Sequence, residues 1–298
     1  MSRSHPPSLL RHCERAVRDH GLFGPGDVVV CACSGGPDST ALLHALALLR
    51  KRIGHALVAH GVDHGLRPEA AAELDLAQRV AEEQGVPFAR TCVQVSPGAN
   101  LQARARTARL QALAAAAREA GARAVATGHT ADDRAETLLL RLLRGAGPRG
   151  LAVLPPSAPF PSLEASPDAP APTFALIRPL LTARRADVLA HIGRHSLPTA
   201  TDPSNADPRF LRVRVRRELV PLMETMSPRI VDQLCALADM IEGGEGDATV
   251  LGELGRAQRA QVDRARRLGR RKVELRLRGG QDVEVAFPDG RIVLTDKP

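Results

Sequence analysis

The sequence predicts an α/β protein with a doubly wound parallel sheet and a second, smaller C-terminal α+β domain. Between residues 28 and 144, short apolar runs alternate with longer segments rich in Ala and Leu. This alternation is expected for strands separated by helices. Further along the chain, residues 273–295 alternate between apolar and polar positions, which is typical of a β-meander.

The parallel sheet begins with residues 28–32, VVVCA, and a Gly-containing loop and a predicted buried helix at 40–50 follow. The cycle repeats, with strands predicted at 56–60, 89–95 and 124–128 and helices at 69–84, 101–120 and 133–144. Ligands of such sheets bind beyond the carboxyl ends of the strands. We therefore expect the loops at 34–39, 62–67 and 128–136 to meet at one edge.

The second half of the chain is interrupted twice. Residues 155–172 are rich in Pro and predict a mobile loop, after which IRPLL at 177–181 predicts a strand end and 182–195 a helix. A helix predicted at 229–242 precedes a second breaker, GGEGD at 243–247, and the meander would comprise 273–278, 282–287 and 291–295. We place the boundary near residue 222, which gives domains of residues 1–222 and 223–298.

Composition excludes several classes of protein. The chain has 298 residues, of which 44% are hydrophobic, so it is not disordered as a whole. No apolar run reaches the ~18 residues of a membrane span, and the N-terminal residues lack the apolar segment of a secretion signal. The five cysteines include no Cys-x-x-Cys pair, which disfavours a disulfide framework or a four-cysteine metal site. We expect a cytoplasmic protein without a membrane partner.

The charge balance indicates a polyanionic partner. The chain carries 41 Lys and Arg against 33 Asp and Glu, a formal net charge of +8, and nearly all of the cations are arginines. No Gly-Lys-Ser/Thr phosphate loop is present, so any phosphate must be bound by another motif.

The strongest local motif is SGGPDS, which comprises Ser34, Gly35, Gly36, Pro37, Asp38 and Ser39. It connects a strand to a helix, a position where backbone N–H groups and the helix N-terminus bind phosphate. Because a carboxylate would repel phosphate, Asp38 fits there only with Mg²⁺ between them. The motif thus predicts a phosphate site with Asp38 as the metal-binding residue; the alternative is a tight turn in which Asp38 favours the helix dipole.

A second motif, GHTADDRAET at 128–137, places Asp133 and Glu136 three residues apart, on one face of a helix. Two carboxylates at a phosphate-binding edge can hold Mg²⁺ or a cationic amine. The alternative is structural, because Thr130 and Asp133 have the spacing of a capping box. His129 precedes the acids and is either a structural histidine or part of the site.

Arginines gather in three places. Arg104, Arg106 and Arg109 lie on an Ala-rich helix, where such charges usually solvate a helix face. A denser cluster suits contact with phosphate or nucleic acid and comprises Arg209, Arg212, Arg214, Arg216 and Arg217. The stretch 256–278 is also rich in arginine, and either binds a nucleic-acid backbone or is a solvated helix.

SGGPDS after a first strand resembles the PP-loop of the N-type ATP pyrophosphatases, which split ATP into AMP and pyrophosphate to adenylate a substrate. Further segments are similar, in the same order, to those of the tRNA(Ile)-lysidine synthetases. They are VDHGLRPEAAAEL at 62–74, GHTADDRAETLLLRLLRGAGPRGL at 128–151, IRPLL at 177–181 and DPSNADPRFLRVRVRRELVP at 202–221. The resemblance covers roughly residues 27–222.

The resemblance implies a PP-loop fold of the adenine nucleotide α-hydrolase type. It implies a ligase that uses ATP and Mg²⁺ to join L-lysine to C2 of the wobble cytidine of CAU-anticodon tRNA(Ile), through an adenylated tRNA. Asp133 and Glu136 would then position lysine, and Arg109 and Arg212 would act near ATP or the reacting base. His64 and Arg67 would lie beside the nucleotide.

The expected partners are this tRNA, free L-lysine and, as an option, a second copy in a homodimer; residues 223–298 would bind the tRNA. Two alternatives stay open. A sulfur-inserting PP-loop enzyme that modifies tRNA cytidine usually needs paired cysteines. A non-catalytic RNA-binding relative would have lost SGGPDS or the acids, which are intact here. An amide-forming PP-loop ligase without RNA fits the arginine clusters poorly.

Overall fold

The computed structural model describes residues 8–296, except 64, 66–68, 96–97, 99, 162–171, 201–206, 208, 243–253, 255–257, 259–260, 263, 266–269, 277–281 and 287–292. The chain divides into two compact units. The first comprises Met1–Thr137 and Leu154–Val231, and the second comprises Leu138–Val153 and Asp232–Pro298. The boundary near residue 222 stays a prediction.

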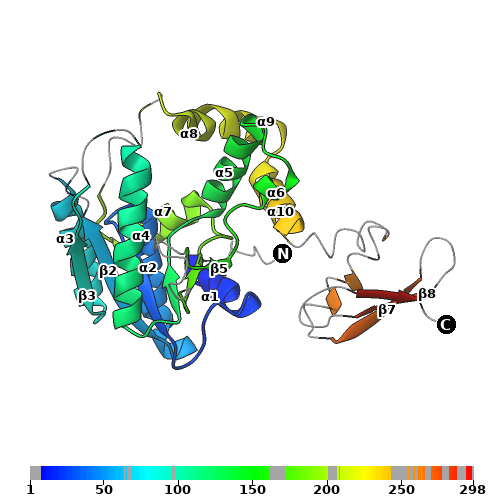
Figure 1. The fold of residues 1–298 in the computed structure, drawn as a ribbon, viewed down its shortest axis with the longest axis horizontal. Helices are drawn as coiled ribbons and strands as arrows, with labels where there is room; N and C mark the ends of the chain where they lie inside the picture. The colour runs from blue at the N-terminus through cyan, green and yellow to red at the C-terminus, as the bar shows by residue number, and fades with distance from the viewer. Residues whose placement is uncertain are drawn as a thin grey trace. The chain divides into compact units, whose positions relative to one another are not determined.

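A six-stranded sheet with the order β3-β2-β1-β4-β6-β5 forms the centre of the first unit (Figure 1). Its strands are β1 Val28–Cys33, β2 Ala56–Asp63, β3 Phe88–Cys92, β4 Ala124–Ala126, β5 Ser157–Pro159 and β6 Ala175–Ile177. All neighbouring pairs are parallel except β5 and β6. From β1, the chain adds β2 and β3 on one side. It then adds β4 and β6 on the other side of β1, which confirms the doubly wound sheet.

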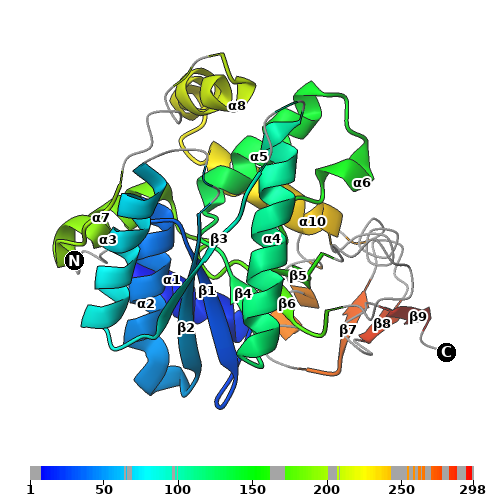
Figure 2. The same ribbon diagram turned by 60° about the vertical axis from the view of Figure 1, so that its left-hand side comes forward.

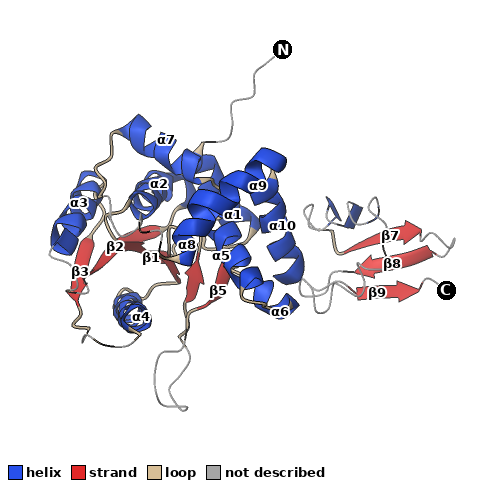
Figure 3. Ribbon diagram, turned by 90° about the horizontal axis from the view of Figure 1, so that it is seen from above, coloured by secondary structure: helices blue, strands red, loops and turns tan. Residues whose placement is uncertain are grey.

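Helices cover both faces of this sheet (Figures 2 and 3). On one face lie α1 Leu9–Asp19, α2 Pro37–Ile53, α3 Glu69–Glu83 and α7 Arg185–His195; α4 Leu101–Glu119 lies on the other. The alternation of β1 supplies both layers, because Val29 and Cys31 belong to the core beneath α2, whereas Val30 belongs to the core beneath α4. The central strand is thus buried on both faces, as its unbroken apolar sequence predicts.

Several details differ from the sequence-based expectations. α1 was not predicted, although its buried residues Leu9, Cys13, Ala16 and Val17 recur at helical spacing. The loop predicted at 155–172 is wrong at its start, because β5 forms an antiparallel edge strand, where Pro is tolerated. The rest of that loop, 162–171, lies outside the described residues, as does the GGEGD breaker. The strand end at Ile177 is confirmed, and α7 begins at Arg185 rather than at 182.

The dense arginine cluster forms part of a helical segment. This segment contains α8 Leu211–Arg214, a wider π-type turn at Val215–Leu219, and α9 Val220–Met226. α5 Ala131–Leu143 carries the acid motif. No helix in the described part of the chain is long and apolar enough to cross a membrane.

The second unit contains α6 Pro148–Leu151, most of α10 Ile230–Glu242, and a three-stranded antiparallel sheet. The strands are β7 Lys272–Arg276, β8 Asp282–Ala286 and β9 Val293–Asp296, in the order β7-β8-β9. The predicted β-meander is therefore confirmed. Its small core includes Leu275, Val283 and Val285, which are the alternating apolar positions of β7 and β8.

Candidate active site

The two main sequence motifs meet between β1 and β4, where the order in which the chain adds strands to the sheet reverses. β1 and β4 are neighbours in the sheet, and SGGPDS follows β1 whereas GHTADD follows β4. Their backbones are in close contact, because a Cβ atom on Gly128 would lie only 2.7 Å from the Asp38 carbonyl oxygen. Only glycine allows this approach. The switch point of a doubly wound sheet, where ligands bind, is thus built from both motifs.

The SGGPDS loop is held by hydrogen bonds within its own six residues. The Ser39 hydroxyl donates to the Gly36 carbonyl at 3.1 Å, and the Ser34 backbone N–H donates to the Ser39 hydroxyl oxygen at 3.1 Å. Gly35 has a φ of +75°, and a Cβ there would lie 2.1 Å from the Glu73 carbonyl oxygen. Pro37 is the first residue of α2, and Gly36 is its N-cap. The loop therefore presents the N-terminus of a 17-residue helix to the sheet edge.

Asp38 lies in the first turn of α2 with one carboxylate oxygen, Oδ1, buried and without a hydrogen-bond partner in the described part of the chain. Burial, together with the neighbouring Asp133 carboxylate, raises the pKa of Asp38 to about 6. A buried oxygen without a partner is unfavourable unless a ligand satisfies it. A divalent cation would both fill this need and reduce the repulsion between the two acids.

Asp133 has the capping role that its spacing from Thr130 predicts. Its Oδ2 atom accepts hydrogen bonds from the Thr130 backbone N–H at 3.0 Å and the Thr130 hydroxyl at 2.9 Å. Burial opposes its ionisation, but the hydrogen bond from the Thr130 backbone N–H and the charge of Arg185 outweigh it, so the pKa of Asp133 is lowered. The second oxygen, Oδ1, is used differently: it accepts from Arg212 at 3.1 Å.

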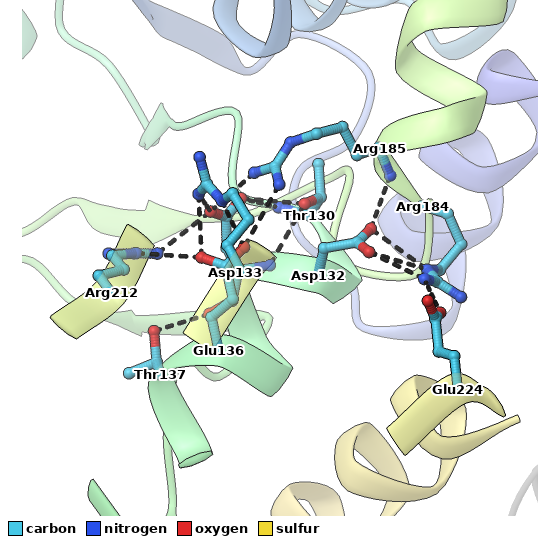
Figure 4. Close-up of polar contacts among 10 residues, drawn as sticks. Thr130, Asp132, Asp133, Glu136, Thr137, Arg184, Arg185, Arg212 and Glu224 are labelled. Carbon is cyan, nitrogen blue, oxygen red and sulfur yellow. Dashed lines mark hydrogen bonds and ion pairs between the residues drawn. The ribbon is translucent and has the colours of Figure 1, made fainter. Parts of the chain in front are cut away.

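Glu136 is 2% exposed and is surrounded by arginine side chains (Figure 4). Arg216 donates to both of its oxygens, at 2.7 and 2.9 Å. Arg212 donates to Oε2 at 3.1 Å and Arg185 to Oε1 at 3.3 Å. The hydrogen bonds to Glu136 raise the pKa of Arg216. The acid pair is therefore held by three arginines, which come from α7, α8 and the π-type turn.

A third acid of this helix, Asp132, joins the same network. It accepts from Arg184 Nη2 at 2.9 Å and from the Arg185 backbone N–H at 2.6 Å, and Arg184 also donates to Glu224 at 2.8 Å. Asp132, Arg184, Arg185 and the inward role of Arg216 were not predicted. One signal was available: two arginines at the start of α7 oppose the helix dipole, which indicates acids nearby.

The remaining predicted residues lie around this network. Arg109, on α4, is not among the arginines that bind the acids. Burial lowers the pKa of His129 to about 4, and the charge of Arg109 makes a smaller contribution in the same direction. His129 is thus neutral, and its Nδ1 lies 2.9 Å from the Thr127 hydroxyl. In the dense cluster, Arg209 pairs with Asp207, and Arg214 pairs with Glu218. His64 and Arg67 lie outside the described residues.

The five cysteines, all within the described residues, do not form a metal-binding set. Cys31 and Cys33 are buried in β1, and Cys13 is buried in α1. Burial raises the pKa of Cys13 to about 12, and a hydrogen bond with Cys33 and burial raise that of Cys31. A thiol that resists ionisation is a poor metal ligand. Cys13 and Cys31 are therefore unsuited to holding a metal cluster.

Comparison with known proteins agrees with this geometry. A sequence profile of the PP-loop domain family matches residues 11–223. The tRNA(Ile)-lysidine synthase of Salinispora arenicola is 38% identical over 247 residues, which cover 81% of this chain and 70% of that protein. The chain belongs to the tRNA(Ile)-lysidine synthase family.

Other relatives define the extent of the match. The tRNA(Ile)-lysidine synthase of Symbiobacterium thermophilum is 39% identical over 243 residues, which cover 79% of this chain but 48% of that protein. The chain thus spans about half the length of this relative of the family. A U34-tRNA thiolase from Methanococcus maripaludis, solved with its [4Fe-4S] cluster, shares the fold, with a TM-score of 0.62, 19% identity and 79% of each chain covered.

Proposed function

We propose that the protein is an ATP-dependent ligase that joins L-lysine to C2 of the wobble cytidine of CAU-anticodon tRNA(Ile), with release of AMP and pyrophosphate. The observation that carries this proposal is the meeting of the SGGPDS loop with the buried acids Asp133 and Glu136, in a chain of this family. Such a ligase needs a phosphate site beside an anionic site for an amine, so that activation and attack occur at one place.

The first step is adenylation. The C2 oxygen of the cytidine attacks the α-phosphorus of ATP, the bond to the β-phosphate oxygen breaks, and pyrophosphate leaves. The backbone of Gly35 and Gly36 and the hydroxyls of Ser34 and Ser39 hold the pyrophosphate at the N-terminus of α2. The loop's internal hydrogen bonds fix these groups before ATP binds, which lowers the cost of reorganisation.

Asp38 is the residue that would hold Mg²⁺ at the phosphates. Its buried, unpartnered oxygen and its raised pKa both fit a site that receives a cation. Bound Mg²⁺ would offset the charge of the departing pyrophosphate. The carboxylate, rather than the carboxylic acid, is the form required, and a nearby cation favours it.

The second step is substitution. The ε-amine of lysine attacks C2, the C2–O bond to AMP breaks, and the nitrogen loses a proton. Asp133 and Glu136 orient this amine. Because Arg185, Arg212 and Arg216 now bind these acids, the amine gains access only as the arginines move to other anions. The phosphates of ATP supply such anions, and arginine binds phosphate as well as carboxylate.

Residues 223–298 would bind the tRNA. They include the arginines Arg264, Arg270 and Arg271, which are exposed, and the β-meander that follows them in the chain. No pair of acid and base groups is predicted there, so the chemistry belongs to the first unit. Arg109, Arg209 and Arg217 are further candidates for contact with ATP or with the tRNA backbone.

The test is incubation of the purified chain with ATP, Mg²⁺, radiolabelled L-lysine and total tRNA. We expect label in RNA and release of AMP and pyrophosphate. Omission of ATP and the variant Asp38→Asn are the matched controls, and neither should give labelled RNA. Pyrophosphate release without label in RNA, under saturating lysine, would contradict the proposed substrate.

A further inference from the structure

Three histidines from two packed helices lie together in the first unit. His44 belongs to α2, and His191 and His195 belong to α7, which packs against α2. His191 and His195 are four residues apart, so they share one face of their helix. Pairs of histidines with this spacing bind metal ions in other helical sites.

Their side chains converge closely. One ring nitrogen from each of the three histidines lies within 4.8 Å of the other two. His44 Nδ1 and His191 Nε2 are 2.9 Å apart, and the His195 ring centroid lies 4.6 Å from that of His44 and 4.5 Å from that of His191. His44 is 4% and His191 3% exposed, whereas His195 is exposed. The cluster thus has a buried side and a side open to water.

We propose that His44, His191 and His195 bind one divalent transition metal ion, and that Zn²⁺ is the ion that they fit best. Three imidazoles with one open position form a known zinc ligand set, in which water completes the tetrahedron. Zinc holds nitrogen ligands about 3.3 Å apart when the Zn–N bonds are about 2.0–2.1 Å. His44 Nδ1 and His191 Nε2 lie 2.9 Å apart and all three nitrogens lie within 4.8 Å of one another, so small rotations of the side chains would bring them to this spacing.

The chemistry of the donors selects the kind of metal. Imidazole nitrogen suits Zn²⁺, Cu²⁺ and Ni²⁺, whereas Mg²⁺ and Ca²⁺ prefer oxygen ligands. This site therefore differs in donor type from the oxygen site at Asp38.

A metal here would join two helices that both begin at the active-site edge. The N-terminus of α2 carries Asp38, and the N-terminus of α7 carries Arg184 and Arg185, which bind Asp132 and Glu136. Because the ion would fix α7 against α2, it would stabilise the relative positions of these residues. Its role would be structural, with no part in the transfer of lysine.

The direct test is metal binding by the full chain. The protein is stripped with a chelator, dialysed against excess Zn²⁺, freed of loosely bound ion and assayed for metal content. We expect one Zn²⁺ per chain. With Co²⁺ as the probe, we expect the intense visible absorption of four-coordinate cobalt without thiolate charge-transfer bands, and X-ray absorption of the zinc form should show only nitrogen and oxygen neighbours.

Variants locate the ion. His195→Ala alters an exposed side chain, so the fold is kept, and it should weaken Zn²⁺ binding by more than the ~10–100-fold typical of outer-shell changes. His20→Ala, at another exposed histidine, is the matched control, and Cys92→Ser controls for the exposed thiol; neither should change the affinity. His44→Gln should abolish binding, with circular dichroism to verify the fold.

Two results would overturn the proposal. One is a wild-type chain that takes up no Zn²⁺ after dialysis, which would show that the histidines only pack against one another. The other is zinc uptake that His195→Ala leaves unchanged or that Cys92→Ser removes. Lysine transfer is measured separately, so a failure of the proposed ligase activity does not affect the outcome of this test.

Discussion

The two halves of the proposed active site are built in different ways. The SGGPDS loop is held by hydrogen bonds that span three to five residues, as between Ser39 and Gly36 or Ser34. The acids of α5 are held by side chains far away in the sequence: Arg185 is 49 and Arg216 is 80 residues from Glu136. One half is held by contacts within a short segment of sequence, and the other is held by contacts that form only when distant segments come together on folding.

This difference matches what each half must do. A phosphate site uses backbone N–H groups, which a short loop can aim by itself. A buried pair of carboxylates needs compensating charge, and long arginine side chains from other elements can supply it. The local half is therefore rigid before ligands bind, whereas the arginine network can exchange one anion for another. Substitutions in each half can separate these two properties.

The largest effect is expected at the local half. Asp38→Asn should lower the rate of pyrophosphate formation by on the order of 10²–10³-fold, because it removes a charge that acts on the departing phosphates. The measurement is ATP-dependent pyrophosphate release with tRNA present. Asp19→Asn, at an exposed acid paired with Arg18, is the matched control. Comparable rates for the two variants would contradict the role of Asp38.

The next effect concerns the long-range half. Glu136→Gln should lower the free energy of unfolding by about 3 kcal/mol, because it leaves three arginines without a carboxylate in a partly buried place. It should also impair lysine transfer more than pyrophosphate formation. Urea unfolding gives the first quantity, and single-turnover assays give the other two.

The matched control is Glu218→Gln, which breaks the exposed pair with Arg214 in the same helical segment. Pairs of this kind contribute about 0.3–0.5 kcal/mol. If both variants lost the same small amount, the arginine network would be no more than surface charge. If Glu136→Gln left lysine affinity and transfer unchanged, the acids would serve only to hold α5 in place.

The pattern of these interactions explains what the sequence could predict. The strands β1 to β4, the helices between them and the capping box of Thr130 and Asp133 follow from residues close in the chain. The pairing of Asp132 with Arg184, or of Glu136 with Arg216, follows only from the topology that brings α7 and the π-type turn at Val215–Leu219 to the β1/β4 edge. Contact of the arginine cluster at 209–217 with phosphate or nucleic acid stays a prediction, and two of its members, Arg212 and Arg216, bind carboxylates in this structure.

The same reasoning applies to elements that went unpredicted. β5 is three residues long and contains Pro159, so its sequence does not mark it as a strand; it forms because β6 offers an unpaired edge. The histidine cluster combines a helical pair at 191 and 195 with His44, 147 residues from His191. Only the packing of α2 against α7 makes it a cluster.

A smaller effect tests the cost of burying the Asp38 carboxylate. The pKa of Asp38 is about 6 in the folded chain against a usual 3.8, so its ionisation destabilises the folded state as the pH rises from about 4 to about 6. At 1.36 kcal/mol per pKa unit, the free energy of unfolding is lowered by roughly 2–3 kcal/mol above pH 6. Replacing Asp38 recovers this amount less about 0.5 kcal/mol, because the favourable interaction of its charge with the helix dipole is lost. Asp38→Asn should therefore be more stable than the wild type at pH 7.

The measurement is the difference in unfolding free energy between wild type and Asp38→Asn at pH 4, 5.5 and 7. The difference should be small at pH 4 and should grow through the other two values. A constant difference would show that Asp38 has an ordinary pKa and that its oxygen is satisfied in solution. Loss of activity together with gain of stability would mark Asp38 as a site residue rather than a helix cap.

The smallest effect separates two kinds of arginine. Some are exposed to solvent and available to bind RNA phosphates, whereas others are bound to carboxylates. Arg264, Arg270 and Arg271 are exposed in the second unit, whereas Arg212 and Arg216 bind Asp133 and Glu136. Changing one of the exposed three to Gln should reduce the slope of log affinity for tRNA against log salt concentration by about one unit for each phosphate that the side chain no longer neutralises. Filter binding of tRNA at several salt concentrations measures this slope.

Arg214→Gln is the matched control, because its charge is already partly offset by Glu218 on the same face. Its slope should change less than that of Arg270→Gln. Equal changes at both sites would mean that the RNA displaces Glu218 from Arg214, and recognition would then extend to the 209–217 cluster. If replacing Arg264, Arg270 and Arg271 together left the salt slope unchanged, these arginines would make no contact with tRNA phosphates. The tRNA would then be bound by the 209–217 cluster, because each phosphate contact by an arginine releases counterions and so adds to the slope.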